Sequence, residues 1–132
     1  MHLPPDSSLR DKLRRVRHLA LDLDGTLYLG GKLFEFTLPF LQTLVELGIG
    51  RTFITNNSSR STRDYVEHLC GLNIEATSDD ILSSTTATLE YLREQQPDVR
   101  KLFVLGTPGL RGSIVTACRS SSPSFPTCST TI

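Results

Sequence analysis

Apolar and polar positions follow one another in blocks along this chain, and the blocks predict strands and helices in turn. An apolar run in residues 16–23 predicts a strand that is covered on both faces, because its apolar positions do not alternate strictly. Short apolar runs at 51–55 and 101–106 predict two further strands. Apolar residues recur at helical spacing in four segments, 7–15, 37–47, 62–70 and part of 77–95.

Turn and capping residues mark where some of these elements begin. A glycine pair inside residues 26–34 predicts a small hairpin. Thr37 is expected to cap the helix that follows it. Ser61, with Asp64 three residues later, predicts a capping box at the start of the next helix.

The order of these elements predicts the fold class. Strand, helix, strand, two helices and strand follow one another, which favours an α/β fold with three parallel strands, right-handed crossovers and helices on both faces. In such sheets ligands bind outside the carboxyl ends of the strands. That rule brings together the segments "DLDGT", "TNNSS" and "GTPG", each of which follows one predicted strand.

Composition and charge exclude some classes of function without choosing one. The 132 residues are enough for one domain, and 14 basic residues balance 14 acidic ones, so no global charge indicates binding to nucleic acid or to a membrane surface. We find no apolar stretch of membrane-spanning length and no signal sequence. Three cysteines without metal-ligand spacing fit a reducing compartment, so we expect a cytoplasmic protein.

The last part of the chain differs from the rest in composition. Residues 113–132 are half serine and threonine, and Arg119 is their only charged residue. We therefore divide the chain into a folded part, residues 1–112, and a tail, residues 113–132, that is expected to be disordered.

Two carboxylates lie one residue apart where the first predicted strand ends. Asp22 and Asp24 project to the same side of an extended segment, so one can act as a nucleophile while the other moves protons. Gly25 allows a sharp turn and the close approach of a ligand. A hard divalent cation such as Mg²⁺ would offset the paired charge and let a phosphate dianion approach.

Neutral hydrogen-bond donors follow the second predicted strand. The "TNNSS" segment offers hydroxyls and amides in a loop before a helix, where free backbone N–H groups favour an anion. Such donors can hold phosphate oxygens and the charge that develops during transfer. A pair of aspartates alone is most often not catalytic, and "TNNSS" alone is most often a turn with a helix cap. Their joint occurrence at successive strand ends favours a catalytic origin.

The same segments resemble a known family. "DLDGTLY" resembles the first motif of the haloacid dehalogenase superfamily, and "TFITNNSSRS" resembles its second motif in the form used by the class IIA phosphatases. The resemblance extends over about residues 16–112. It implies a Rossmann-like, doubly wound parallel sheet and the hydrolysis of a small phosphorylated metabolite through a phospho-aspartate.

The resemblance also implies a role for each site residue. Asp22 would attack phosphorus, and Asp24 would protonate the leaving oxygen and then activate water. Mg²⁺ would be held by the Asp22 carboxylate and the Asp24 backbone carbonyl. The substrate-binding positions that the resemblance implies are Thr55, Asn56, Asn57 and Gly25.

Several parts of the family's pattern are not found in this sequence. The resemblance implies a later lysine, an acidic pair that completes the Mg²⁺ shell and a cap domain that selects the substrate. The lysines here are Lys12, Lys32 and Lys101, and no acidic residue follows Asp98. We therefore expect a partial core of three strands with flanking helices, without the cap domain and the C-terminal half of the core, and a phosphatase that is inactive or weakly active as this chain.

Two other interpretations stay open at this stage. Missing strands would leave the strand that carries Asp22 with an unpaired edge, so the chain can instead be a non-catalytic fragment that pairs this edge with a full-length relative or with a second copy. A phosphotransferase of the same superfamily would differ only in its acceptor, and the "TNNSS" form argues mildly against it.

Overall fold

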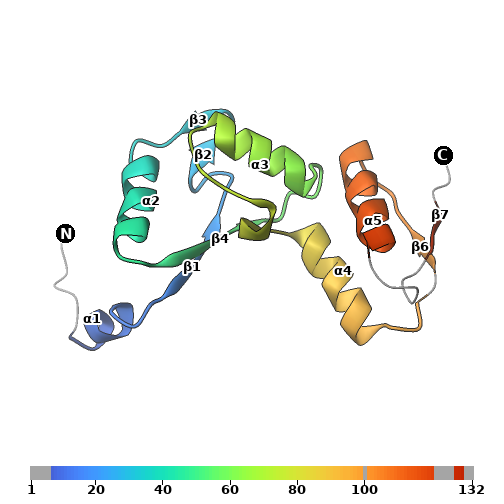
Figure 1. Ribbon diagram of the computed structural model, residues 1–132, viewed down its shortest axis with the longest axis horizontal. Helices are drawn as coiled ribbons and strands as arrows, with labels where there is room; N and C mark the ends of the chain where they lie inside the picture. Colours follow the sequence, from blue (N-terminus) through green and yellow to red (C-terminus); the bar gives the residue numbers. More distant parts are fainter. Residues whose placement is uncertain (1–6, 100, 121–126, 130–132) are drawn as a thin grey trace.

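The computed structural model describes residues 7–99, 101–120 and 127–129, which form an elongated molecule with α1 at one end and α5 near the other (Figure 1). In chain order the elements are α1 (Ser7–Leu13), β1 (His18–Asp22), β2 (Tyr28–Leu29), β3 (Lys32–Leu33), α2 (Thr37–Glu46), β4 (Gly50–Thr55), α3 (Thr62–Gly71), η1 (Ser78–Asp80), β5 (Ile81–Ser83), α4 (Ser84–Gln95), β6 (Lys101–Phe103), α5 (Pro108–Ser120) and β7 (Thr127–Ser129).

A three-stranded parallel sheet forms the centre of the molecule, in the order β1-β4-β5. Its register places Asp22 of β1 opposite Ile54 of β4, and Thr55 of β4 opposite Ser83 of β5. The predicted α/β class, with three parallel strands and flanking helices, is confirmed.

The third strand of this sheet is not the one that the sequence predicts. Residues 81–83 form β5 within the segment 77–95, where we expected a helix and no strand, and α4 follows them with Ser83 as its N-cap. The strand expected at 101–106 is shorter, and it pairs with β7 outside the central sheet. Because three residues are too few to show a period, pairing with β4 rather than local pattern makes β5 a strand.

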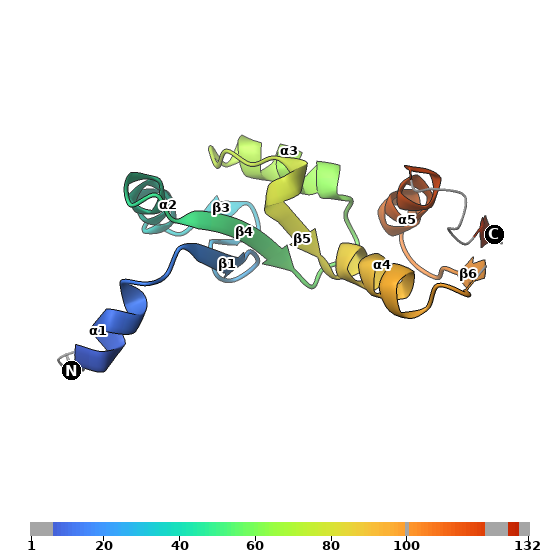
Figure 2. The ribbon, with the colours of Figure 1, turned by 60° about the horizontal axis from the view of Figure 1, so that its bottom comes forward.

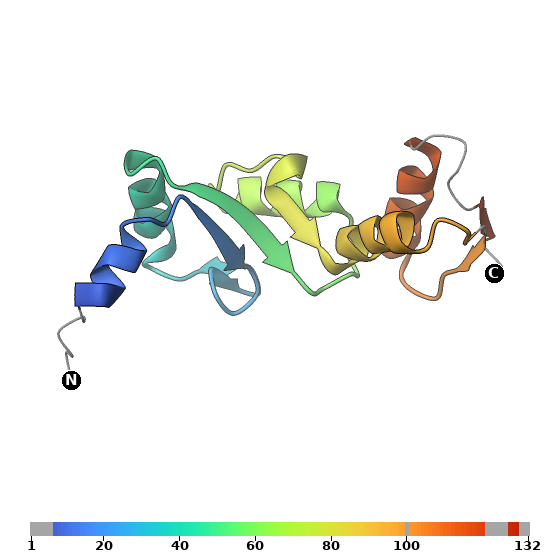
Figure 3. The ribbon, with the colours of Figure 1, turned by 90° about the horizontal axis from the view of Figure 1, so that it is seen from below.

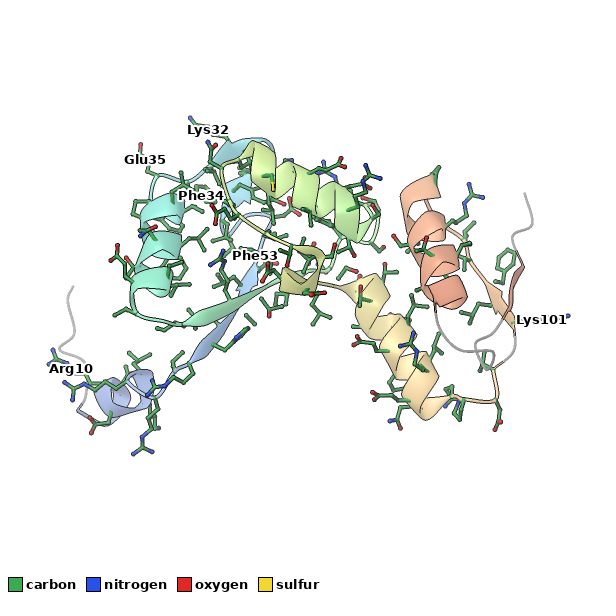
Figure 4. The ribbon with its side chains drawn as sticks, viewed as in Figure 1. Arg10, Lys32, Phe34, Glu35, Phe53 and Lys101 are labelled. Carbon is green, nitrogen blue, oxygen red and sulfur yellow. The ribbon has the colours of Figure 1, made fainter. Side chains whose placement is uncertain are left out.

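Both α2 and α3 cover the same face of the central sheet, as Figures 2 and 3 show. The two crossovers step across the sheet in one direction, and right-handed connections then put their helices on one side. The core lies between these layers around Phe53 of β4, which is fully buried and lies among the sheet, α2 and α3 (Figure 4).

The opposite face of β1 is open. His18, Ala20 and Asp22 are exposed, whereas Leu19 and Leu21 alternate with them and pack against the core. Our expectations of a first strand covered on both faces, and of helices on both faces of the sheet, are therefore wrong for the described residues. The physical reason is that both crossovers step across the sheet in one direction, which places α2 and α3 on the same side and leaves the other face of β1 uncovered.

The local turn and cap signals are largely confirmed. β2 and β3 form the predicted antiparallel hairpin, and Ser61 and Asp64 form a reciprocal capping box at the start of α3. Thr37 differs from its prediction, because Phe36 is the N-cap residue of α2. The buried Thr37 hydroxyl instead donates to the Leu27 carbonyl oxygen at 2.6 Å, which ties α2 to the turn before the hairpin.

The last long helix crosses the boundary that we expected at residue 112. α5 continues to Ser120, and Ile114 within it is buried, so residues 113–120 are helical rather than disordered. Of the remaining expected tail, β7 is described, and residues 121–126 and 130–132 lie outside the described residues. No helix in the described ranges is long and apolar enough to cross a membrane.

Candidate active site

The carboxyl ends of β1 and β4 lie next to each other at the same end of the sheet. β1 ends at Asp22, and β4 ends at Thr55, one position beyond the register partner of Asp22. Neighbouring strands run about 4.8 Å apart, so the backbones at these two residues are adjacent. The arrowheads of β1 and β4 point the same way in Figure 3. The two segments that the sequence singled out therefore lie side by side.

A tight turn follows β1 and presents its two carboxylates to solvent. Asp22 and Asp24 are exposed, whereas Leu23 between them is fully buried and anchors the turn. Gly25 has a φ of +82°, which L side chains rarely adopt. Its N–H donates to the Tyr28 carbonyl oxygen at 2.7 Å, so this glycine shapes the turn and its N–H is engaged within it.

A hydrogen bond from a threonine orients the first carboxylate. Thr26 Oγ1 donates to Asp22 Oδ2 at 2.8 Å. Among the described residues no hydrogen-bond donor meets Asp22 Oδ1, so that oxygen is available to a reacting group or a cation. We did not predict a role for Thr26 from the sequence. The sequence feature that could have indicated this contact is its position four residues after Asp22, inside a predicted turn.

Hydrogen bonds shape the loop after β4. The Asn57 N–H donates to Thr55 Oγ1 at 3.2 Å, and Asn57 Oδ1 accepts from the N–H and the hydroxyl of Ser59 at 3.0 and 2.6 Å. The Ser84 hydroxyl, at the start of α4, donates to the Asn56 carbonyl oxygen at 3.2 Å. These bonds hold the backbone of the loop and leave the exposed side-chain amide of Asn56 free among the described residues.

The third predicted segment, "GTPG", also reaches this loop, although its strand lies outside the central sheet. The Thr107 hydroxyl donates to the Ser59 carbonyl oxygen at 2.9 Å. A Cβ added at Gly109 would lie 2.9 Å from the same oxygen, so the backbones approach closely here. The predicted meeting of the second and third segments is therefore confirmed, by contact with α5 rather than by strand pairing.

Two buried tyrosines behind the strand ends were missed by the sequence analysis. Tyr65 of α3 donates to the Asn57 carbonyl oxygen at 2.9 Å, and its oxygen lies 3.3 Å from Thr55 Oγ1. Burial raises the pKa of Tyr28 to about 12, and the Asp24 carboxylate adds to that rise. In the sequence both tyrosines lie at positions typical of core residues. No local pattern therefore distinguished them from other core residues.

The donor set at this edge fits a hard divalent cation. The described residues contain no group of three or more His, Cys, Asp or Glu side chains that could hold a metal ion. Mg²⁺, however, is commonly bound through one or two carboxylates together with water and substrate phosphate, and Asp22 and Asp24 supply two exposed carboxylates.

The lysines lie on outer parts of the molecule. Figure 4 shows Lys32 at the outer rim of the β2–β3 hairpin and Lys101 on β6, beyond α4 and α5, with its side chain directed outward. Lys12 belongs to α1, at the opposite end.

Comparisons with known proteins show the family of this chain. A family model described as haloacid dehalogenase-like hydrolase matches residues 19–117. The chain is 34% identical over 102 residues to the 5'-nucleotidase YutF of Bacillus subtilis, a match that covers 77% of this chain and 40% of that protein. It is 30% identical over 105 residues to an acid sugar phosphatase of Staphylococcus aureus, covering 80% and 40% respectively. The chain thus spans 40% of the length of these relatives.

Solved structures of phosphatases also resemble this chain. The 4-nitrophenylphosphatase of Thermotoga maritima superposes with a TM-score of 0.72 at 34% identity, covering 79% of this chain and 40% of that one. The glycerol phosphate phosphatase Rv1692 of Mycobacterium tuberculosis, in complex with magnesium, superposes with a TM-score of 0.67 at 27% identity, covering 88% and 32%.

Proposed function

The chain belongs to the haloacid dehalogenase-like hydrolases, and from that premise we propose that it carries the phosphoryl-transfer site of a Mg²⁺-dependent phosphomonoester hydrolase. The observation that carries the proposal is that Asp22 and Thr55 lie at the carboxyl ends of two neighbouring parallel strands, β1 and β4. The phosphatase relatives support this reaction class. The proposed substrate is a small phosphorylated metabolite of the cytoplasm.

In the proposed reaction Asp22 is the nucleophile. The bond from Thr26 to Oδ2 leaves Oδ1 to attack phosphorus, so that a phospho-aspartate forms while the bond from phosphorus to the ester oxygen breaks. Asp24 donates a proton to the departing oxygen. In the second step Asp24 takes a proton from the attacking water, which releases inorganic phosphate and restores the Asp22 carboxylate.

Neutral groups of the loop after β4 bind the transferring phosphoryl group in this proposal. The Thr55 hydroxyl and the side-chain amides of Asn56 and Asn57 can donate to its oxygens, and they offset charge that develops on those oxygens. No heavy atom lies within 4 Å of a Cβ built at Gly25, so in this proposal the space beside the turn is open to the phosphoryl group.

Mg²⁺ is the proposed cofactor. The Asp22 carboxylate and the Asp24 backbone carbonyl would hold it, and when bound it offsets the paired negative charge that would repel a phosphate dianion. The magnesium complex of the M. tuberculosis relative supports this choice.

We expect little or no turnover from the 132-residue chain alone. The sequence has no acidic residue after Asp98, and its lysines lie on outer parts of the molecule. Phosphate monoesters need accelerations of up to about 10²¹-fold, so a site without those groups loses most of the rate.

Transfer of a phosphoryl group to Asp22 tests the proposal. The purified chain is incubated with acetyl phosphate and Mg²⁺ and then analysed by mass spectrometry. One phosphoryl group is expected on the peptide that contains Asp22. Asp22→Asn removes it, whereas Asp79→Asn, at an exposed aspartate of η1, does not. Absence of the adduct from the folded chain, or its persistence in Asp22→Asn, contradicts the proposal.

Steady-state hydrolysis of 4-nitrophenyl phosphate checks the expected weak activity separately. A rate close to the uncatalysed background is expected from the chain alone. Substantial turnover that Asp22→Asn abolishes overturns the expectation of weak activity, while it supports the reaction class.

A second candidate function, a non-catalytic binding role, is favoured by the free edge of β1. Among the described strands β1 pairs with β4 alone, so its other edge can accept a strand from a full-length relative. Stable co-purification with such a relative, together with an unmodified Asp22 after treatment with acetyl phosphate, favours this role over catalysis.

A further inference from the structure

Tyr65 links the two ends of a short segment in the loop after β4. Its side chain is 1% exposed, and its hydroxyl oxygen lies 2.9 Å from the Asn57 carbonyl oxygen and 3.3 Å from Thr55 Oγ1. It belongs to the first turns of α3, which the capping box of Ser61 and Asp64 fixes. A buried hydroxyl is thus held against both Thr55 and Asn57.

The direction of each hydrogen bond follows from counting protons. The single hydroxyl proton of Tyr65 is donated to the Asn57 carbonyl oxygen. The contact between Tyr65 and Thr55 must therefore use the Thr55 hydroxyl proton, with the Tyr65 oxygen as acceptor. Thr55 Oγ1 in turn accepts the Asn57 N–H at 3.2 Å. The three residues form a closed ring in which every hydroxyl both donates and accepts.

The bond from Thr55 to Tyr65 is the weakest part of this ring. Its length of 3.3 Å exceeds the usual value of about 2.7–2.8 Å for a hydroxyl pair. The Thr55 proton is therefore held in one direction but only loosely. A phosphate oxygen is a charged and stronger acceptor, and it can take this proton while the other two bonds of the ring persist.

We propose that Tyr65 is a positioning residue: its bond to the Asn57 carbonyl fixes Asn57, whose N–H holds Thr55 Oγ1, and so places the Thr55 hydroxyl for donation to a phosphoryl oxygen. This inference rests on the proposed function. Tyr65 acts through Thr55 and through the Asn57 carbonyl, without touching the phosphoryl group. Binding of phosphate exchanges the bond from Thr55 to Tyr65 for a bond from Thr55 to phosphate.

Titration with inorganic phosphate in the presence of Mg²⁺, followed by NMR of the Thr55 and Asn57 amides, tests the proposal. Tyr65→Phe removes only the hydroxyl, and Tyr91→Phe is the matched control because Tyr91 is 59% exposed on α4. Loss of the hydrogen bond that anchors the Asn57 carbonyl predicts about three- to tenfold weaker phosphate binding by Tyr65→Phe. The Tyr91→Phe chain is expected to bind phosphate as the unaltered chain does.

A double variant separates positioning from general stabilisation. Because Tyr65 acts through the Thr55 hydroxyl, adding Tyr65→Phe to Thr55→Val is expected to weaken phosphate binding no further than Thr55→Val alone. A Tyr65 that only stabilises the fold would lower the melting temperature in Tyr65→Phe and leave phosphate affinity unchanged.

A measurement on the unaltered chain does not depend on whether the variants fold. The ¹³Cζ resonance of Tyr65 responds to hydrogen bonds at its hydroxyl, so it is expected to shift when phosphate takes the Thr55 proton. The ¹³Cζ resonance of Tyr91 is expected to stay in place.

Failure of this inference can be told apart from failure of the proposed function. If the unaltered chain shows no phosphate-dependent change at Thr55, the proposed function is wrong, and the role of Tyr65 is wrong with it. If the unaltered chain binds phosphate but Tyr65→Phe binds it equally well, or the Tyr65 ¹³Cζ resonance does not move, only the role of Tyr65 is overturned.

Discussion

The turn after β1 places two like charges one residue apart while it buries the residue between them. Leu23 is fully buried, so Asp22 and Asp24 are held at the surface, where solvent screens their repulsion. Thr26 donates to one oxygen of Asp22 and thereby orients the other. Among the described residues the turn therefore leaves the second oxygen of the Asp22 carboxylate without a hydrogen-bond donor.

The raised pKa of Tyr28, at the end of this turn, predicts that the chain loses stability at high pH. Burial, aided by the Asp24 carboxylate, raises the pKa of Tyr28 from 10.0 to about 12, so folding favours the neutral hydroxyl. Its contribution to the free energy of unfolding is therefore present below pH 10.0 and is lost as the pH rises through about 12. Urea unfolding at a series of pH values is expected to show that the free energy of unfolding falls over this pH range. In Tyr28→Phe this fall is expected to be smaller.

The phenyl ring of Tyr28→Phe keeps the edge-to-face contact with His68, whose ring centroid lies 5.0 Å away. The variant therefore isolates the hydroxyl. If the unaltered chain and Tyr28→Phe lose stability equally over this pH range, another group is responsible for the decline.

The start of α3 is the element on which the loop after β4 depends. Ser61 accepts the Asp64 N–H, and Asp64 accepts the Ser61 N–H at 2.8 Å. The backbone N–H and the hydroxyl of Ser61 lower the pKa of Asp64, so the stabilisation from this carboxylate is present at neutral pH and fades on acidification. One turn later the same helix places Tyr65 against the loop.

Removal of this cap is expected to destabilise the chain. Ser61→Ala eliminates the side-chain bond to the Asp64 N–H, which is expected to lower the free energy of unfolding by about 1 kcal/mol. Ser78→Ala, at an exposed serine of η1, serves as the control and is expected to change it by less than about 0.5 kcal/mol. Urea denaturation followed by circular dichroism measures both. Equal effects of the two substitutions would show that the cap contributes nothing specific.

At the scale of the whole molecule the central sheet is covered from one side and open along one edge. α2 and α3 lie over one face (Figure 2), while Ala20 and Leu82 are exposed on strands of the sheet. β1 has a strand neighbour on one side among the described strands. Backbone groups along such an edge are available to another chain.

This open edge predicts self-association that increases with protein concentration. Ala20→Lys places a charge on the edge strand and is expected to shift the chain toward monomer, because a charged edge opposes strand pairing. Ala87→Lys adds the same charge at an exposed position of α4 and is expected to have no such effect. Sedimentation analysis over a range of concentrations measures both. Unchanged association in Ala20→Lys would exclude this edge as the interface.

Features that depend on residues close together in the chain could be read from the amino-acid order. The apolar runs identified β1 and β4, the glycine pair identified the hairpin, and Ser61 with Asp64 identified the start of α3. Parallel pairing then placed Asp22 and Thr55 at one sheet edge. These predictions hold because periodicity, capping and turn formation are governed by neighbouring residues, and because the order of strands and helices restricts how they pair.

Features that depend on contacts between distant segments of the chain were decided only by the tertiary structure. Residues 81–83 become a strand through hydrogen bonds to β4, since so short a run has little preference of its own. The open face of β1 follows from crossovers that place α2 and α3 on the same side. The contact of Tyr65 with Thr55 requires α3 to fold back onto the strand before it. Such contacts form only when the chain closes on itself, so no local pattern encodes them.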